Sequence, residues 1–251
     1  MLLLSIPIGI LIGVLLGMVG FGGSLLGTPL LILVAGFNFY DASTSALFIV
    51  LTSSLLALAL RDKTELHKKI LLPAIVFGML GTPLGSLASM VLPNNLSKLI
   101  LAVLLVAAGV LAWRGVGSEQ RAQLGQTHPV FAALMFAFVG FTTGLTGVGG
   151  GYLLVPGLIF IYGLSFSRAV TTSLAVVVFN AVLSLSFRMW QGVSFSNEQW
   201  FDVGLIVVAA LVGSAIGSLW TKKISKALVQ RIFALVLFAL AVALTLRILP
   251  A

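Results

Sequence analysis

Eight long apolar runs, separated by short polar connections, decide what this chain can fold into. With edges good to a few residues, they cover 3–36, 42–60, 70–92, 96–113, 130–163, 168–187, 201–220 and 227–249. A helix that crosses a bilayer needs about 20 consecutive apolar residues. Only 8% of the 251 residues are charged, which is too few to cover the surface of a soluble domain. The sequence therefore predicts an all-α integral membrane protein that crosses the cell membrane several times.

Two of the runs are too long to be single crossings. Residues 3–36 and 130–163 each hold 34 residues, or about 50 Å of helix against a hydrocarbon core of roughly 30 Å. Glycines interrupt both near the middle, at 17–23 and at 144–151, and a proline follows in each, at Pro29 and Pro156. We expect each run to form two shorter helices around an irregular turn.

The two interrupted runs belong to an internal repeat. A shift of 127 residues aligns 17–47 with 144–174, and 13 of these 31 positions are identical, the glycines and the proline among them. Farther along, a shift of 132 pairs Gly81 and Gly85 with Gly213 and Gly217. The sequence thus predicts two related halves, 1–113 and 130–251, joined by a connecting loop at 114–129.

The basic residues indicate how the halves are oriented. If all eight runs crossed the membrane once, eight Lys and Arg would lie on one side of it and six on the other. So small a difference does not say which side faces the cytoplasm. If the two interrupted runs instead enter and return on the same side, eleven basic residues, in 61–69, 114–121, Arg168 and 222–231, share one side and three remain on the other. Cytoplasmic loops are enriched in Lys and Arg. This favours three crossings per half and therefore an inverted repeat, although either interrupted run could instead be a tilted span.

Irregular backbone at membrane depth is tolerated only inside the protein or along a wet cavity. The helix that restarts after each break, near Ser24 and near Gly151, would point free N–H groups and the positive end of its dipole at the break, which suits an anion. The following runs add hydroxyls and one amide. The predicted substrate site consists of Gly20, Gly22, Gly23, Ser24, Thr28, Thr44, Ser45, Gly147, Gly149, Gly150, Gly151, Thr171, Thr172 and Asn180.

Simpler interpretations remain open for several of these features. Glycines four residues apart are more often a close helix-packing face than a site, and serine and threonine in membrane helices commonly bond their own backbone. Asp41 reads as a helix N-cap, His67 and His128 as loop residues, and Arg168 as a residue that reaches toward lipid head groups. No Lys or Arg lies deep in any run, so we expect neutral donors and helix dipoles to hold the anion.

Several classes of function are excluded. The chain has no cysteine, which rules out disulfides and thiolate metal sites. It also offers no nucleophile with a base inside the bilayer, and no Walker-type loop. The net charge of +8 sits in short connections, which fits anionic lipid better than nucleic acid. We expect no enzymatic activity, no cofactor, no metal and no nucleic-acid partner. A homodimer is left open.

The repeated Gly-x-Gly-Gly element followed by proline, at 20–29 and 147–156, resembles the sulfite exporter TauE/SafE family of membrane permeases, as does Ala-x-Thr-[Ser/Thr] at 42–45 and 169–172. The resemblance covers both halves. It implies export of sulfite, a C2 sulfonate such as sulfoacetate, or a related organosulfur anion, bound near the glycine motifs. The halves differ at Ser24 and Thr28, where the second half has Gly151 and Val155.

We therefore expect a secondary transporter that works by alternating access around a site between the two halves. The alternatives are a non-transporting membrane scaffold, in which the broken helices only serve packing, and a carrier for another small organic anion.

Overall fold

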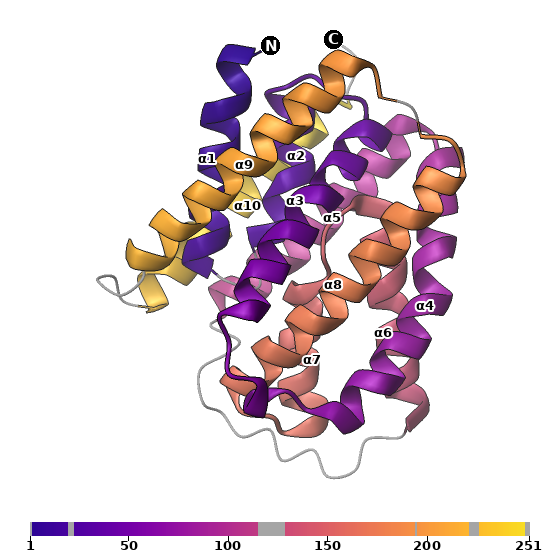
Figure 1. Ribbon diagram of the computed structural model, residues 1–251, viewed down its shortest axis with the longest axis vertical. Coiled ribbons are helices and arrows are strands. Elements are labelled where there is room, and N and C mark those ends of the chain that lie inside the picture. Colours follow the sequence, from indigo (N-terminus) through magenta and orange to yellow (C-terminus); the bar gives the residue numbers. More distant parts are fainter. Residues whose placement is uncertain (1, 20–22, 115–128, 194, 221–225, 249–251) are drawn as a thin grey trace.

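The computed structural model of the chain describes residues 2–19, 23–114, 129–193, 195–220 and 226–248. Within these residues the chain forms ten α-helices, two short 3-10 helices and no strand (Figure 1). In chain order they are α1 (Leu2–Val19), η1 (Gly23–Leu26), α2 (Gly27–Leu33), α3 (Phe39–Ala59), η2 (Lys63–Glu65), α4 (Lys68–Val91), α5 (Asn94–Trp113), α6 (Pro129–Thr146), α7 (Gly151–Tyr162), α8 (Phe166–Trp190), α9 (Asn197–Trp220) and α10 (Lys226–Leu246). The predicted all-α class is confirmed.

Seven of the described helices, namely α3, α4, α5, α6, α8, α9 and α10, are long and apolar enough to cross a membrane. Large apolar side chains point outward from them. Leu72 and Leu84 on α4, Val103 on α5 and Val242 on α10 are between 59% and 67% exposed. So many exposed large apolar side chains fit a lipid environment and would make a water-soluble protein aggregate. The protein is a multi-pass membrane protein.

Both long apolar runs are interrupted in the structure. In the second run, α6 ends at Thr146 and α7 begins at Gly151, and between them Gly147 and Gly150 have φ of +70° and +65°. Only glycine adopts this left-handed conformation without steric cost, so the glycines predicted to break the helix do so. In the first run, α1 ends at Val19 and η1 begins at Gly23; Gly20 and Gly22 lie outside the described residues.

The helices that follow the two breaks differ in length. After the first break, the 3-10 helix η1 leads into α2, which has only seven residues. After the second break, α7 starts at once and has twelve. The helices restart where the sequence predicts, near Ser24 and near Gly151, and the second half offers the longer of the two helices.

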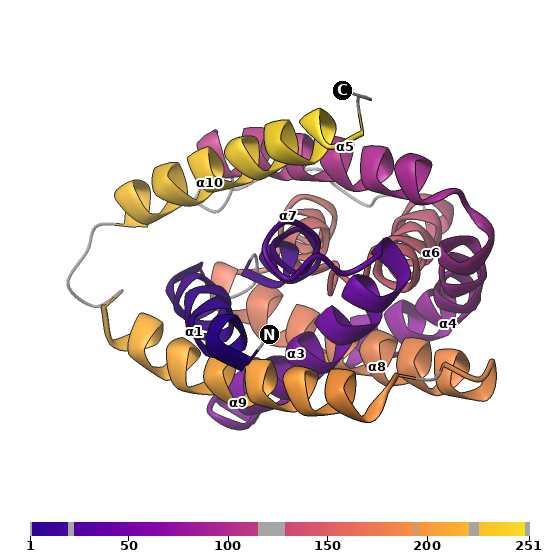
Figure 2. The same ribbon diagram turned by 90° about the horizontal axis from the view of Figure 1, so that it is seen from above.

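The long helices pack in pairs, and each pair joins one helix from residues 1–113 to one from residues 130–251. α1 lies along α9 and α4 along α6, while α5 lies along α10 and α3 along α8. Seen from above, α5 and α10 form one side of the molecule, α8 and α9 the opposite side, and α7 lies between them (Figure 2). The short helices are thus enclosed by the long ones.

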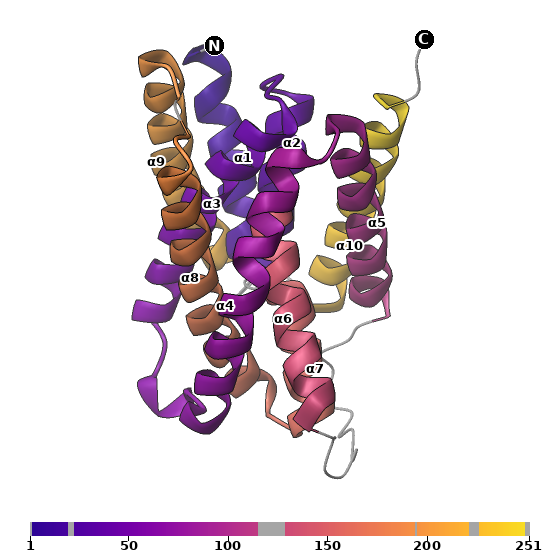
Figure 3. The ribbon, with the colours of Figure 1, turned by 90° about the vertical axis from the view of Figure 1, so that its right-hand side faces the viewer.

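Hydrogen bonds define the two ends of the helix bundle, which we call face A and face B. At face A, Arg247 at the end of α10 donates to the carbonyls of Ile32 and Leu33 at the end of α2. Phe39 N–H, at the start of α3, donates to Asn94 Oδ1 at the start of α5 (3.1 Å). The start of α1 lies at this same end of the bundle (Figures 1 and 3). The α1–α2 segment therefore begins and ends at face A.

Face B is the end where α4 and α8 begin. There, His67 N–H, just before α4, donates to Thr172 Oγ1 near the start of α8 (3.1 Å). The ring of Tyr162 at the end of α7 stacks on that of Phe136, with centroids 6.3 Å apart. Since Phe136 lies in the first half of α6, the α6–α7 segment begins and ends at face B. The two interrupted segments therefore enter the bundle from opposite ends.

Glycines bring the helix pairs close together. A Cβ at any of four glycines would overlap a backbone carbonyl oxygen of the neighbouring helix. The pairs are Gly81 with Ala137, Gly85 with Phe141, Gly213 with Ile10, and Gly217 with Val14. The packing interpretation of these glycines is therefore correct. The contacts on α4 and α6 are related to those on α9 and α1 by the shifts of 132 and 127 residues that relate the two sequences.

One local prediction was wrong. Asn38, not Asp41, is the N-cap of α3, because its Oδ1 accepts the N–H of Asp41 (2.8 Å). The helix begins three residues before the apolar run does, so Asp41 lies in its first turn, where a negative charge still favours the helix dipole.

Candidate functional site

The second helix break contacts the first interrupted segment inside the bundle. Thr28, in the first turn of α2, donates its hydroxyl to the carbonyl of Thr146 at the end of α6, over 2.6 Å, and both residues are fully buried. Val148 N–H, inside the second break, is 3.3 Å from Thr146 Oγ1. A Cβ at Gly147 would overlap the carbonyl oxygen of Ser43 on α3. Thr28, the second break and the start of α3 therefore form one interior cluster.

The Thr28 bond gives a testable prediction about this junction. Thr28→Val keeps the shape of the side chain but removes the donor to Thr146, so we expect the free energy of unfolding to fall by about 1–2 kcal/mol. Thr245→Val is the matched control, because Thr245 bonds only Ala241 in its own helix. We expect the control to stay within about 0.5 kcal/mol of the wild type. Reversible unfolding in mixed micelles measures both, and equal effects would contradict a specific role for the bond.

The predicted site residues do not all lie in this cluster. Thr171 and Thr172 are near the start of α8 at face B, where Thr171 bonds the carbonyl of Ser167 and Thr172 accepts from His67. Thr44 does belong to the cluster, since it follows Ser43 at the start of α3, at the face A side, where it bonds the carbonyl of Tyr40. Because α3 and α8 run in opposite directions, their repeat-related hydroxyls lie at opposite ends of the bundle.

The remaining predicted residues lie near the breaks or along the helices. Ser45 Oγ, and both the oxygen and the nitrogen of the Asn180 amide, are buried with no hydrogen-bond partner among the described residues. Asn180 lies in the middle of α8 and faces Gly78 of α4. Gly149 lies in the second break, Gly151 starts α7, and Gly23 and Ser24 fall in η1.

Arg188 is the residue that sequence reasoning missed. The apolar run was predicted to end at 187, with no Lys or Arg deep in any run, but α8 continues to Trp190. Arg188 is 0% exposed. An apolar run always appears to end at its first charge, so a helix that continues through the charge is missed. The only sequence signal for the longer helix is the next glycine, Gly192, which ends it with φ of +82°.

Hydroxyl and carbonyl oxygens surround the Arg188 guanidinium. Its Nη1 donates to Ser43 Oγ (2.8 Å), Thr44 Oγ1 and the carbonyl of Tyr40 (3.3 Å). Its Nη2 donates to Ser89 Oγ (3.0 Å) and the carbonyl of Gly144 (2.6 Å). The centroid of the Tyr40 ring lies 4.9 Å from the Arg188 guanidinium carbon. We call these five acceptors, Tyr40, Ser43, Thr44, Ser89 and Gly144, the arginine cage.

The cage satisfies hydrogen bonds but does not neutralise charge. The ion pair that the structure records within its described part joins Arg168 to Glu65 at face B (3.8 Å), and no described carboxylate pairs with Arg188. The Nε of Arg188 is buried without a partner among the described residues. A buried cation is normally paired, and an ionisable group inside a membrane bundle indicates a functional site. The expectation that no Lys or Arg lies deep in the protein is therefore corrected.

A cleft leads to the cage from face A. It has a volume of about 180 Å³ and is lined by Asn38, Phe39, Tyr40, Ser89, Met90, Leu92, Asn94 and Ser97. Tyr40 and Ser89 belong to both the cleft and the cage. Ser97 adds a hydroxyl that is buried without a partner among the described residues. The cleft is large enough for a small ion with a few waters.

Comparison with known proteins places this arrangement in a family. The sequence model of the sulfite exporter TauE/SafE family matches residues 5–244, which include both breaks, the cage and Arg188. The chain belongs to the sulfite exporter TauE/SafE family. It is thus a membrane transporter and not an enzyme, and the resemblance inferred from the repeated glycine motifs is confirmed.

Curated relatives of this TauE/SafE chain carry matching descriptions. A probable membrane transporter protein of Xylella fastidiosa strain Temecula1 is 30% identical over 251 residues, covering 96% of this chain and 94% of the relative. Its counterpart in strain 9a5c is 29% identical over 250 residues, with the same coverage. The probable membrane transporter protein y4hK of Sinorhizobium fredii is 32% identical over 149 residues, covering 57% and 58%. No solved structure matches the chain.

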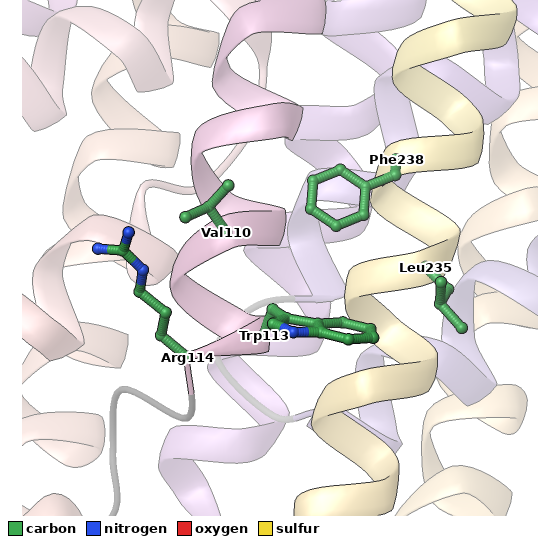
Figure 4. Close-up of a pocket in the computed structure, with 5 residues that line it drawn as sticks. All are labelled: Val110, Trp113, Arg114, Leu235 and Phe238. Carbon is green, nitrogen blue, oxygen red and sulfur yellow. The ribbon is translucent and has the colours of Figure 1, made fainter.

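A second, larger groove of about 350 Å³ lies between α5 and α10 (Figure 4). Figure 4 shows the rings of Trp113 and Phe238 between the two helices. Leu235, Val110 and Arg114 complete the lining. None of the predicted site residues contributes to this groove, and its surface is almost wholly apolar. It is therefore a poor candidate for the transport site of a TauE/SafE protein.

Proposed function

We propose that the protein is a secondary transporter that exports a small sulfur-containing anion, such as sulfite or a C2 sulfonate, by alternating access. The observation that carries this proposal is Arg188, a fully buried cation that no described carboxylate neutralises, beside the point where the second break contacts α2. An anion that lies between the halves would supply the missing charge. Family membership supports the sulfur-containing class of substrate.

The halves would be inverted repeats, 1–113 and 130–251, joined by the loop 114–129. The exchange of packing partners supports this arrangement, since α1 packs on α9 as α6 packs on α4. The glycine contacts recur with the same two sequence shifts. In this plan α3, α4, α5, α8, α9 and α10 cross the membrane, and α1–α2 and α6–α7 enter from opposite faces and return. Such repeats place the substrate near the middle of the membrane, where half-helices end.

The charge distribution supports an orientation with face B in the cytoplasm. Residues 61–69 and Arg168 lie at that face, and with 114–121 and 222–231 they make eleven basic residues. Lys98, Arg188 and Arg247 remain for face A. Export would then carry the anion from face B to face A, between α7, the second break and the cage.

A flux assay in proteoliposomes tests this function. We expect the purified protein to carry sulfite and sulfoacetate with saturable kinetics and with counterflow, because a carrier must cycle between two states. Taurine, whose amine cancels the sulfonate charge, should move more slowly if net negative charge is what the site recognises. Protein-free liposomes give the background. A scaffold would move no anion, a channel would show neither saturation nor counterflow, and either result would reject the proposal.

A further inference from the structure

We infer that Arg188 binds the transported anion and that the arginine cage is the gate of face A, which opens when the anion replaces the cage oxygens around the guanidinium. This inference deepens the proposed function and rests on it.

The cage connects the two halves of the protein. Arg188 belongs to α8 in the second half, whereas Tyr40, Ser43 and Thr44 belong to α3 and Ser89 to α4 in the first half. Four of the five acceptors therefore tie α8 to the other half at face A. While these bonds hold, α3 and α4 cannot move away from the end of α8. The guanidinium thus acts as a latch on this side of the membrane.

An anion can compete with the cage because it brings charge. Hydrogen bonds between a guanidinium and an anionic oxygen are about twice as strong as bonds to neutral acceptors. The Ser43, Thr44 and Ser89 oxygens are neutral, and the Arg188 Nε has no described partner. Sulfite and sulfonate groups present three oxygens, which suits the planar fork of an arginine better than the point charge of a lysine. Anion binding would therefore loosen the bonds between α8 and the first half.

The cleft at face A supplies the route to the latch. Its lining residues Tyr40 and Ser89 are cage members, so an ion that leaves the guanidinium enters the cleft directly. Ser97, whose hydroxyl has no described partner, offers a donor on the way. Release of the cage would widen this cleft, since Ser89 is at the end of α4 and Tyr40 at the start of α3.

Anion binding to purified protein in detergent tests the role of the guanidinium. We expect Arg188→Gln to weaken the binding of sulfite and sulfoacetate by about tenfold or more, and Arg188→Lys to retain part of it. Arg247→Gln is the matched control: this arginine also lies at face A and bonds carbonyls, but it lies outside the cage. Binding is measured per folded molecule, from the shift of the melting temperature with anion concentration. Unchanged affinity in folded Arg188→Gln would overturn the inference.

A second measurement leaves Arg188 intact and reports on the gate. Because the chain has no cysteine, Ser97→Cys creates a single thiol, buried in the cleft. The labelling rate follows the fraction of molecules in which face A is open. We therefore expect saturating sulfoacetate, which raises that fraction, to speed labelling by a membrane-impermeant maleimide at least about tenfold. Unchanged or slower labelling would overturn the gating role. If the wild type carries no anion, the proposed function fails; if it does and these variants behave as wild type, only this inference fails.

A different observation carries a second proposal, which concerns Arg61. The 127-residue shift relates Arg188 to Arg61. α8 continues through Arg188, but α3 ends at Ala59, and Arg61 is exposed beyond it at face B, with no side-chain bond to a described residue. One of two related arginines is thus latched and the other free. Alternating access exchanges the conformations of inverted halves, so we propose that Arg61 takes the latched position when face A is open.

Thr171 Oγ1 and the Ser167 carbonyl provide acceptors at face B that match Thr44 and Tyr40 by the same shift. Because Arg61 makes no such contact in this structure, Arg61→Gln should leave the melting temperature within about a degree of the wild type. We nevertheless expect saturable flux to fall about tenfold, through the loss of charged hydrogen bonds in the other state. Wild-type flux in Arg61→Gln would overturn this proposal and leave the Arg188 inference standing.

Discussion

Gly85→Leu is expected to prevent α4 and α6 from packing and to leave almost no folded protein in the membrane. Even a single Cβ at Gly85 would overlap the carbonyl oxygen of Phe141 and approach the backbone nitrogen of Leu145. Neither atom can rotate away, so the helices would have to separate along their whole contact. Close backbone approach is a main source of helix association in lipid. We therefore expect a loss of at least about 3 kcal/mol in the free energy of unfolding.

The matched control is Gly204→Leu on α9, where a Cβ would meet nothing within 4 Å. This position is exposed to lipid, so we expect normal yield and stability. Gly217→Leu should be as damaging as Gly85→Leu, because its Cβ would overlap the carbonyl oxygen of Val14 in the related helix pair. Yield of monodisperse protein and unfolding in mixed micelles measure all three. A stable Gly85→Leu protein would contradict the close packing of α4 on α6.

Gly147→Ala should have the second largest effect, because two costs coincide at this position. With φ of +70°, any residue with a Cβ is strained by about 1–2 kcal/mol. The new Cβ would also overlap the carbonyl oxygen of Ser43, and relieving that overlap adds about 1–3 kcal/mol. Since Ser43 is a cage residue, the displacement would reach Arg188, and we expect transport per folded molecule to fall as well.

Gly163→Ala separates the two costs. Gly163 has nearly the same backbone conformation, with φ of +63°, but a Cβ there would meet nothing within 4 Å. It should lose only the strain, about 1–2 kcal/mol, and keep normal flux. If Gly147→Ala destabilised the protein no more than Gly163→Ala, the close approach of the second break to α3 would not hold.

Substitutions near the second break are expected to affect transport because the break is bonded to Arg188 through Gly144. The carbonyl of Gly144, in the last turn of α6 before the break, accepts a hydrogen bond from Arg188. Thr146, at the end of the same helix, bonds Thr28 of the first interrupted segment. A change at the second break can therefore affect the cage and the first interrupted segment. This is the kind of connected, tightly packed junction that switches between discrete arrangements rather than deforming smoothly.

The sequence by itself determined the class of protein, the position of the interruptions and the family. Apolar runs of about 20 residues can only be buried in lipid or in each other, and closely clustered glycines favour an interruption of the helix. The same glycines at Gly147 and Gly150 end α6 in the structure. These conclusions depend on local properties of the chain, so they could be read without knowing which helices meet.

Only the tertiary structure decided which residues share a site. Thr44 and Thr171 have the same local sequence but lie at opposite ends of the bundle, because α3 and α8 are antiparallel. Arg188 looked like a residue of a polar connection, yet it is buried among oxygens from three other helices. Burial of a charge depends on what surrounds it, and those partners are 44 to 148 residues away in the chain. No local pattern of hydropathy contains that information.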